Sequence, residues 1–217
     1  MNFSNKDGGK IIFELIKTIQ DKKDFLSEVD GKIGDGDHGI NMNKGFTMTY
    51  CKVNGKDYLA VTDNYDNVNT QPKDDTLLED IGGSMGPLYG AFFDGLSEAS
   101  EDHDVIDKKT FQKMIHTALE AIQDIGNAKR GDKTLLDTLI PAVEAYDAAL
   151  EAGKDFKEAL SELKSAAEAG WKSTEDMVAK IGRASRLGER SRGVLDAGAT
   201  SCYLILESLA TSIQSIL

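Results

Sequence analysis

The chain has little cysteine, little proline and no excess of positive charge. Its 217 residues include two cysteines and three prolines, and the formal net charge is −12 at pH 7. Cys51 and Cys202 lack the spacing of metal ligands, which predicts reduced cysteines in the core of a cytosolic protein. Scarce proline beside abundant Ala, Leu, Glu and Lys favours an all-α fold. The acidic balance excludes the basic surface with which general nucleic-acid-binding proteins neutralise phosphates.

Long apolar runs are absent as well. No run approaches the roughly 20 residues of a transmembrane helix, and residues 1–10 contain no apolar signal core. We therefore expect a cytoplasmic protein that makes no membrane contact. Forty per cent of the residues are hydrophobic, and no linker rich in proline or serine divides the sequence. These features predict a single domain over residues 1–217.

Apolar residues recur every three or four positions, which is the pattern of a helix with one buried face. This pattern predicts five helices, over residues 11–19, 111–125, 136–150, 156–181 and 202–213. Two shorter helices are predicted over residues 39–50 and 87–100. The polar segment 52–76 is ambiguous, and no alternating apolar pattern predicts a sheet.

Three aspartates, Asp30, Asp35 and Asp37, lie within eight residues of one another and alternate with glycines. Their mutual repulsion would raise at least one carboxyl pKa unless a cation neutralised them. The glycines allow backbone conformations that bring the three carboxylates around one point. Residues 30–39, hereafter the acidic loop, therefore predict a site for a hard cation with oxygen ligands, Mg²⁺ above all, with room left for phosphate.

The acidic loop has two alternative interpretations. A calcium EF-hand is excluded by spacing, because a loop that begins at Asp35 places Phe46 at the twelfth position, where a bidentate glutamate is needed. A solvated loop without a ligand stays open, since Asp and Gly are common in turns for reasons of backbone geometry alone.

Two further loops could bind phosphate. The turn Gly82–Pro87 could expose backbone N–H groups to an anion at a helix N-terminus, or it could be only a tight turn. Residues 182–193, hereafter the arginine loop, contain four of the five arginines. Arginine suits phosphate, carboxylate and stacked purine rings, although a solvated basic loop is the simpler alternative. Asp132 or Thr134 is predicted to cap the helix that follows, and Asp196 to cap the last helix.

The order of helices and loops relates these segments to one another. In an up-and-down bundle, alternate loops lie at the same end. The acidic loop, the Gly82–Pro87 turn and the arginine loop can therefore meet if an even number of helices separates them. A metal cluster, a phosphate-binding turn and several cations at one place would suit phosphoryl transfer, which depends on positioning and charge neutralisation.

The sequence resembles the nucleotide-binding L subunits of bacterial dihydroxyacetone kinases. The resemblance covers nearly the whole chain and rests on four separated motifs in the order of that family. They are Asp30 with Gly34–Asn43, then Gly82–Gly90, Gly131–Thr134 and Gly182–Ser185.

The resemblance implies a barrel of eight antiparallel helices with the nucleotide bound in loops at one rim. It implies that Asp30, Asp35 and Asp37 hold two Mg²⁺ ions that bridge the phosphates of ADP or ATP. The other implied nucleotide contacts are His38 and Asn41 at the phosphates, Ser84 and Met85 in the glycine-rich turn, and Gly126, Leu135, Arg183, Asp196, Ala197 and Gly198 around adenine and ribose.

The resemblance also implies partners. A free-standing L subunit keeps ADP bound, and an M subunit of the phosphotransferase system recharges it. The phosphoryl group then passes to dihydroxyacetone, or a related ketose, on a separate K subunit. This chain departs from the family in two places, since Asp196-Ala197-Gly198 replaces the usual Asp-Pro-Gly and Gly193-Val194-Leu195 replaces a histidine-containing segment.

Two hypotheses follow. The first is a phosphoryl-transfer subunit, a kinase component that uses Mg²⁺ and nucleotide, in which no residue is predicted to be a nucleophile or general base. The second is a sensor whose Mg²⁺–nucleotide state is detected by a transcription regulator on which it docks. The sequence leaves open which ketose is used, whether the donor is a phosphotransferase protein or free ATP, and whether the chain forms a homodimer.

Overall fold

The computed structural model describes residues 1–5, 8–50 and 85–217, and within these ranges eight α-helices make up most of the chain. The all-α prediction is therefore confirmed. The helices are α1 (Gly8–Asp21), α2 (Lys23–Gly31), α3 (His38–Tyr50), α5 (Met85–Ser100), α6 (Lys108–Ile125), α7 (Leu136–Glu151), α8 (Phe156–Ser173) and α9 (Ala197–Ile216). Two 3₁₀ segments, η2 (Thr174–Asp176) and η3 (Arg183–Ser191), connect α8 to α9.

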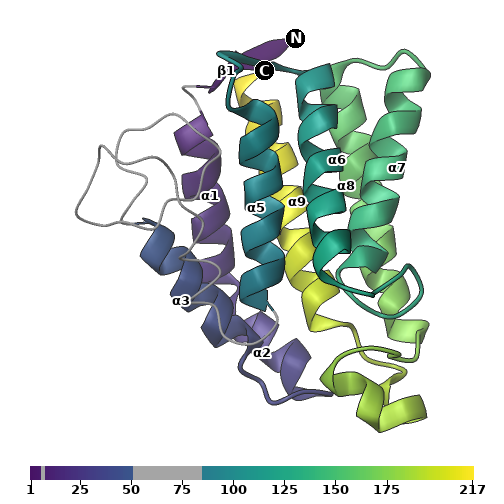
Figure 1. Ribbon diagram of the computed structural model, residues 1–217. Helices are drawn as coiled ribbons and strands as arrows, with labels where there is room; N and C mark the ends of the chain where they lie inside the picture. The colour runs from purple at the N-terminus through teal and green to yellow at the C-terminus, as the bar shows by residue number, and fades with distance from the viewer. Residues whose placement is uncertain (6–7, 51–84) are drawn as a thin grey trace.

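The helices run up and down in an antiparallel bundle (Figure 1). In the bundle α5 packs on α6, α7 on α8, and α9 lies between α8 and α1. The acidic loop, the start of α5, residues 126–135 and the arginine loop all lie at one end, here called the loop end. Both chain termini lie at the opposite end. This arrangement confirms the predicted convergence for the segments that the structure describes.

The core forms from the apolar faces that the sequence pattern predicts. In α1, the side chains of Ile11, Leu15, Ile16 and Ile19 are completely buried. At the far end from the acidic loop, the rings of Phe111, Tyr146 and Phe156 pack together, with the nearest centroids 5.4 Å apart. Among the helices of the described ranges, none combines the length and apolar character that crossing a membrane requires.

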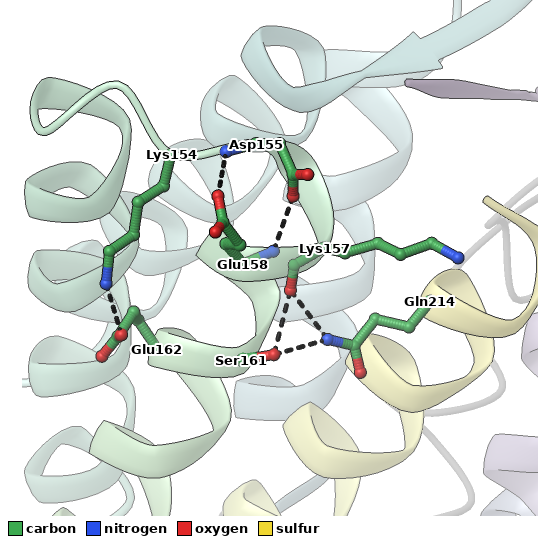
Figure 2. Close-up of polar contacts among 7 residues, drawn as sticks. All are labelled: Lys154, Asp155, Lys157, Glu158, Ser161, Glu162 and Gln214. Atoms are coloured by element: carbon green, nitrogen blue, oxygen red, sulfur yellow. Dashed lines mark hydrogen bonds and ion pairs between the residues drawn. The ribbon is translucent and has the colours of Figure 1, made fainter.

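Polar caps decide where several helices begin. The Asp107 carboxylate accepts hydrogen bonds from the N–H groups of Lys109 and Thr110, both at 2.8 Å, and so begins α6. A capping box begins α8, in which Asp155 and Glu158 each accept a hydrogen bond from the other's backbone (Figure 2). These caps satisfy N–H groups that have no partner within their own helix.

The structure differs from the predicted elements in three places. The helix predicted over 156–181 ends at Ser173, because Met177 is extended and the chain turns toward the arginine loop. The helix α2 was not predicted separately. Strands β1 (Asn2–Ser4) and β2 (Val105–Asp107) form a small antiparallel ladder, with Phe3 opposite Ile106, and three residues are too few to show an alternating pattern. Cys51 and the segment 52–76 lie outside the described residues.

Candidate functional site

A cavity of about 500 Å³ opens at the loop end of the bundle. Its walls come from the acidic loop, the starts of α5 and α9, the end of α6 with the residues after it, and residues 181–184. Twelve of the thirteen predicted site residues line it: Asp30, Asp35, Asp37, His38, Asn41, Met85, Gly126, Leu135, Arg183, Asp196, Ala197 and Gly198. The thirteenth, Ser84, lies outside the described residues. The structure thus brings the residues together, while their binding roles stay predictions.

The three aspartates meet at the rim of this cavity. Asp30, Asp35 and Asp37 each offer a carboxylate oxygen, and these oxygens lie within 4.8 Å of one another. One oxygen of Asp30 accepts hydrogen bonds from the N–H groups of Gly36, at 2.8 Å, and His38, at 3.4 Å. Three hard oxygen donors in one small cluster fit the ligand preference of Mg²⁺.

Two glycines allow the acidic loop to fold in this way. A Cβ atom at Gly34 would overlap the Asp30 carboxylate, so a larger residue there would displace a predicted ligand. Gly36 has a φ of +77°, in the left-handed region that other L-residues rarely adopt. The glycines therefore have a direct structural role in gathering the carboxylates, as the sequence pattern predicted.

A cation faces the carboxylates from the arginine loop. The Arg183 guanidinium forms an ion pair with Asp35, and the two side chains are 64% and 48% exposed. Arg183 and Asp35 are 148 positions apart in the sequence, yet both line the same cavity. A phosphate group between them would meet metal ligands on one side and a guanidinium on the other.

His38, at the start of α3, is held by a buried hydrogen-bonding group. Its Nε2 atom lies 3.0 Å from the Ser201 hydroxyl, which lies 2.6 Å from the Tyr89 hydroxyl. Burial lowers the pKa of the His38 imidazole to about 4, and the nearby Asp30 carboxylate opposes this shift only in part. The imidazole is therefore neutral near pH 7, and its orientation is set by Ser201.

The start of α9 forms another wall. Asp196 caps the helix by accepting a hydrogen bond from the Ala199 N–H at 2.7 Å, as the sequence predicted. Burial raises the pKa of the Asp196 carboxyl to about 6, although that hydrogen bond and the charge of Lys133 favour the ionised form. Ala197 and Gly198 follow in the first turn, where helix amides and the helix dipole favour an anionic ligand.

The residues around the start of α7 differ from the prediction. Asp132 does not cap this helix, since its carboxylate accepts from the Lys129 N–H and pairs with Lys180. Thr134 is not the N-cap either, because Leu135 holds that position without a side-chain cap, but the Thr134 hydroxyl accepts a hydrogen bond from the Leu136 N–H at 3.2 Å. The main stabiliser is Asp137, whose carboxylate accepts from the N–H groups of Gly131 and Thr134.

Sequence reasoning also missed Lys133, which lines the cavity but is almost completely buried. Its ammonium group donates three hydrogen bonds to backbone carbonyls of the segment between α8 and α9. Lys133 stands in the motif Gly131–Thr134 without a role assigned to it, and its place in that motif was the available signal.

Comparisons with known proteins agree with this geometry. The DAK2 domain matches residues 32–211. The chain is 35% identical over 189 residues to the ADP-binding subunit DhaL of the PEP-dependent dihydroxyacetone kinase of Escherichia coli K12, covering 87% of this chain and 88% of that subunit. It is 36% identical over 191 residues to the corresponding subunit of kinase 1 from Listeria innocua, covering 88% of each.

A solved structure has the same fold. The crystal structure of the dihydroxyacetone kinase from C. freundii, in complex with AMP-PNP and Mg²⁺, superposes with a TM-score of 0.64 at 22% identity. The match covers 98% of this chain and 35% of that kinase. With the domain match and the two similar subunits, these comparisons show that the chain belongs to the family of L subunits of dihydroxyacetone kinases.

Proposed function

We propose that this chain is the nucleotide-binding subunit of a dihydroxyacetone kinase and holds ADP or ATP together with Mg²⁺. The observation that carries the proposal is the cluster of three carboxylates at the rim of a cavity whose other walls include Arg183 and the N-terminus of α9. Two relatives that match over most of their length have names that describe ADP-binding subunits. The cavity is also large enough for a small ligand.

Different residues of the site would bind different parts of the nucleotide. Asp30, Asp35 and Asp37 would hold Mg²⁺, two ions by family resemblance, and the ion supplies charge neutralisation at the phosphates when bound. His38 and Asn41 lie at the start of α3 beside the carboxylates and would donate hydrogen bonds to phosphate oxygens.

The other end of the nucleotide would lie among the remaining walls of the cavity. Ile125 and Ile181 line it and keep about half and two fifths of their surface exposed, so an apolar ring could cover them. The predicted contacts to adenine and ribose are Gly126, Leu135, Arg183, Asp196, Ala197 and Gly198. Met85, with Ser84 before it, would supply the turn at the start of α5.

The reaction we propose is transfer of a phosphoryl group to dihydroxyacetone or a related ketose held by a separate K subunit. Positioning and charge neutralisation carry most of the catalysis of such transfers, so this chain needs no nucleophile of its own. Consistent with that role, the polar groups of the described site include three clustered carboxylates, a neutral imidazole and a guanidinium. An M subunit of the phosphotransferase system would restore the phosphoryl group on bound ADP, and free ATP is the alternative donor.

Our first prediction tests the metal assignment. Asp35→Asn removes a negatively charged metal ligand, so we expect Mg²⁺-dependent ADP affinity to fall at least about tenfold. The helix content should not change, because Asp35 is exposed and contributes nothing to the core. Calorimetric titration of ADP with Mg²⁺ measures the affinity, and circular dichroism measures the helix content.

The matched control is Asp104→Asn, which changes an exposed aspartate outside the site. It should leave ADP affinity unchanged. Equal affinities for wild type and Asp35→Asn would remove the basis of the metal assignment.

A second experiment separates the kinase subunit from the nucleotide sensor that the sequence left open. Isotope-labelled phosphate on the loaded subunit should pass to a ketose when the K subunit is present. Absence of transfer with every phosphoryl donor, despite tight binding of Mg²⁺ and nucleotide, would instead favour the sensor.

A further inference from the structure

Lys133 connects the segment 177–194, which contains the arginine loop, to the residues before α7. Its ammonium group donates hydrogen bonds to the carbonyl oxygens of Ser191 at 2.5 Å, Val194 at 2.6 Å and Met177 at 3.1 Å. Met177 precedes the arginine loop by five residues. Ser191 lies near the end of that loop, and Val194 follows it directly. The lysine therefore holds together, from inside the protein, the two ends of this segment, residues 177–180 and 191–194, hereafter the neck.

The rest of the neck is built around the same point. The Ser191 hydroxyl accepts a hydrogen bond from the Ala179 N–H at 2.9 Å and donates one to the Gly188 carbonyl at 2.6 Å. The Lys180 N–H donates to the Asp132 carbonyl at 3.1 Å. These bonds connect the two chain segments of the neck to each other and to the residues before α7.

The position of Lys133 is itself strongly determined. Its φ is +64°, and among the described residues it is the only non-glycine residue with a positive φ. Such a conformation costs free energy and persists where the surroundings impose it. Asp137, which is buried, holds the turn from α7 by accepting hydrogen bonds from Gly131 and Thr134.

The ammonium group has no capacity left for a ligand. Lysine has three N–H donors, and all three are used by backbone carbonyls. Only 1% of the residue is exposed, so removing the ammonium would take a hydrogen-bond donor from three carbonyls, in one buried and two partly buried hydrogen bonds. Lys133 lines the cavity, yet it can influence a bound nucleotide only through the groups that it holds.

We infer that Lys133 is a positioning residue, which fixes Arg183 opposite the acidic loop and thereby slows the release of the nucleotide. The inference rests on the proposed function, because it presumes that the cavity holds a Mg²⁺–nucleotide. Arg183 supplies the contact across the cavity and Lys133 determines where that contact lies. A loosened neck would allow Arg183 to leave Asp35 and open that side of the cavity.

The test measures ADP release from the full chain at saturating Mg²⁺, by displacing a fluorescent ADP analogue with excess ADP. Lys133→Met keeps the length of the side chain and removes the ammonium, and we expect release about tenfold faster than in wild type. The matched control is Lys180→Met, which changes an exposed lysine of the same neck, paired with Asp132 at 3.4 Å. Its release rate should stay within about twofold of wild type.

A double-mutant cycle distinguishes positioning from a general loss of structure. Arg183→Ala alone should also speed release, and adding Lys133→Met to it should change the rate by less than about twofold, since both act through one contact. The inference would be overturned if the increases in release rate of the two single variants multiplied in the double variant. An unchanged release rate in Lys133→Met would overturn it as well.

A milder variant covers the case in which Lys133→Met does not fold. Ser191→Ala removes the hydroxyl that closes the neck but leaves the bonds of Lys133 to backbone carbonyls possible. It should also speed release, again without further effect when Arg183 is alanine, and unchanged release would contradict the inference. If wild type fails to bind ADP with Mg²⁺ at all, the proposed function itself is wrong, which is a separate result.

Discussion

The ion pair between Arg183 and Asp35 sets a fixed positive charge beside the three carboxylates. This charge attracts phosphate but repels a divalent cation that binds alone. The same side chain should therefore act in opposite directions on the two ligands of the site.

Our second prediction follows from this opposition. Arg183→Ala should weaken binding of ADP with Mg²⁺ and strengthen binding of Mn²⁺ alone, each by a few-fold, since the charges are partly exposed and screened. Calorimetry measures the first change, and the electron paramagnetic resonance of free Mn²⁺ measures the second. Arg186→Ala, which changes an exposed arginine of the same loop, is the control and should alter neither. Weaker binding of Mn²⁺ alone would mean that Arg183 supports the metal site.

At this scale, sequence and structure agree where the chemistry lies in residue type and spacing. The three aspartates are close in sequence and alternate with glycines, so their meeting could be predicted. Lys133 could not be assigned, because its partners are backbone carbonyls 44, 58 and 61 positions away. Any residue type could supply those carbonyls, and no pattern in the sequence marks them.

Among the helices, α8 shows most clearly how a local motif sets a boundary. Figure 2 shows the capping box of Asp155 and Glu158, the ion pair of Lys154 with Glu162 at 2.5 Å, and the Gln214 amide from α9. Gln214 donates to the Lys157 carbonyl and to the Ser161 hydroxyl, both at 2.8 Å. The start of α8 is therefore attached to the last helix.

The third prediction concerns this cap. Asp155→Ala should lower the free energy of unfolding by about 1 kcal/mol, because the Glu158 N–H loses its partner. ADP affinity should not change, since this cap is outside the cavity. Thermal unfolding and calorimetry measure the two quantities. Lys157→Ala, whose side chain points away from these contacts in Figure 2, should change stability by less than about 0.5 kcal/mol. An equal loss in both variants would show that the cap contributes nothing.

The fourth prediction concerns the departure from the family at α9. Ala197 is the first residue of this helix, and Asp196 before it is extended, with φ −80° and ψ 134°. Proline is favoured at the first helical position and requires an extended residue before it. Ala197→Pro should therefore raise the free energy of unfolding by roughly 0.4 to 1 kcal/mol.

Ala199→Pro is the matched control, because it removes the N–H that donates to Asp196. It should lower the melting temperature, whereas Ala197→Pro should raise it. A fall in both would show that the wall of the cavity has no room for the proline ring.

The existence of seven of the eight described helices could be predicted from the sequence, α2 being the exception, and helix ends only in part. The apolar stripe continues from α8 through Thr174 and Val178, which suggested a helix to residue 181. The structure ends it earlier because distant groups compete for the chain, with the Thr174 hydroxyl accepting from the Asp196 N–H and Lys133 bonding to Met177. Tertiary contacts of this kind override a local period.

For the molecule as a whole, the main feature is that five separate stretches of chain form one cavity. A ligand that contacts the acidic loop, α5, residues 122–136, residues 181–184 and the start of α9 would connect segments from nearly the full length of the sequence. Binding should then stabilise the entire fold, because the folded state alone presents these walls together.

The fifth prediction measures this coupling. Mg²⁺ and ADP at about 100 times the dissociation constant should add about 2.7 kcal/mol of stability and raise the melting temperature by roughly 5 to 10 °C. Chelation of Mg²⁺ by EDTA should remove most of the rise, since the phosphates would then meet the carboxylates without a cation. Thermal scans with and without EDTA test this. An equal rise in both would show that the nucleotide binds without the aspartates.

Both chain termini lie at the end of the bundle opposite the cavity (Figure 1). A dye, an affinity handle or a surface anchor joined to either terminus would thus be separated from the mouth of the cavity by the full length of the long helices. Molecules immobilised in this way would all present the mouth to the surrounding solution. The encounter with the K subunit that we propose could then be timed directly on the anchored chain, without the attachment obstructing the approach.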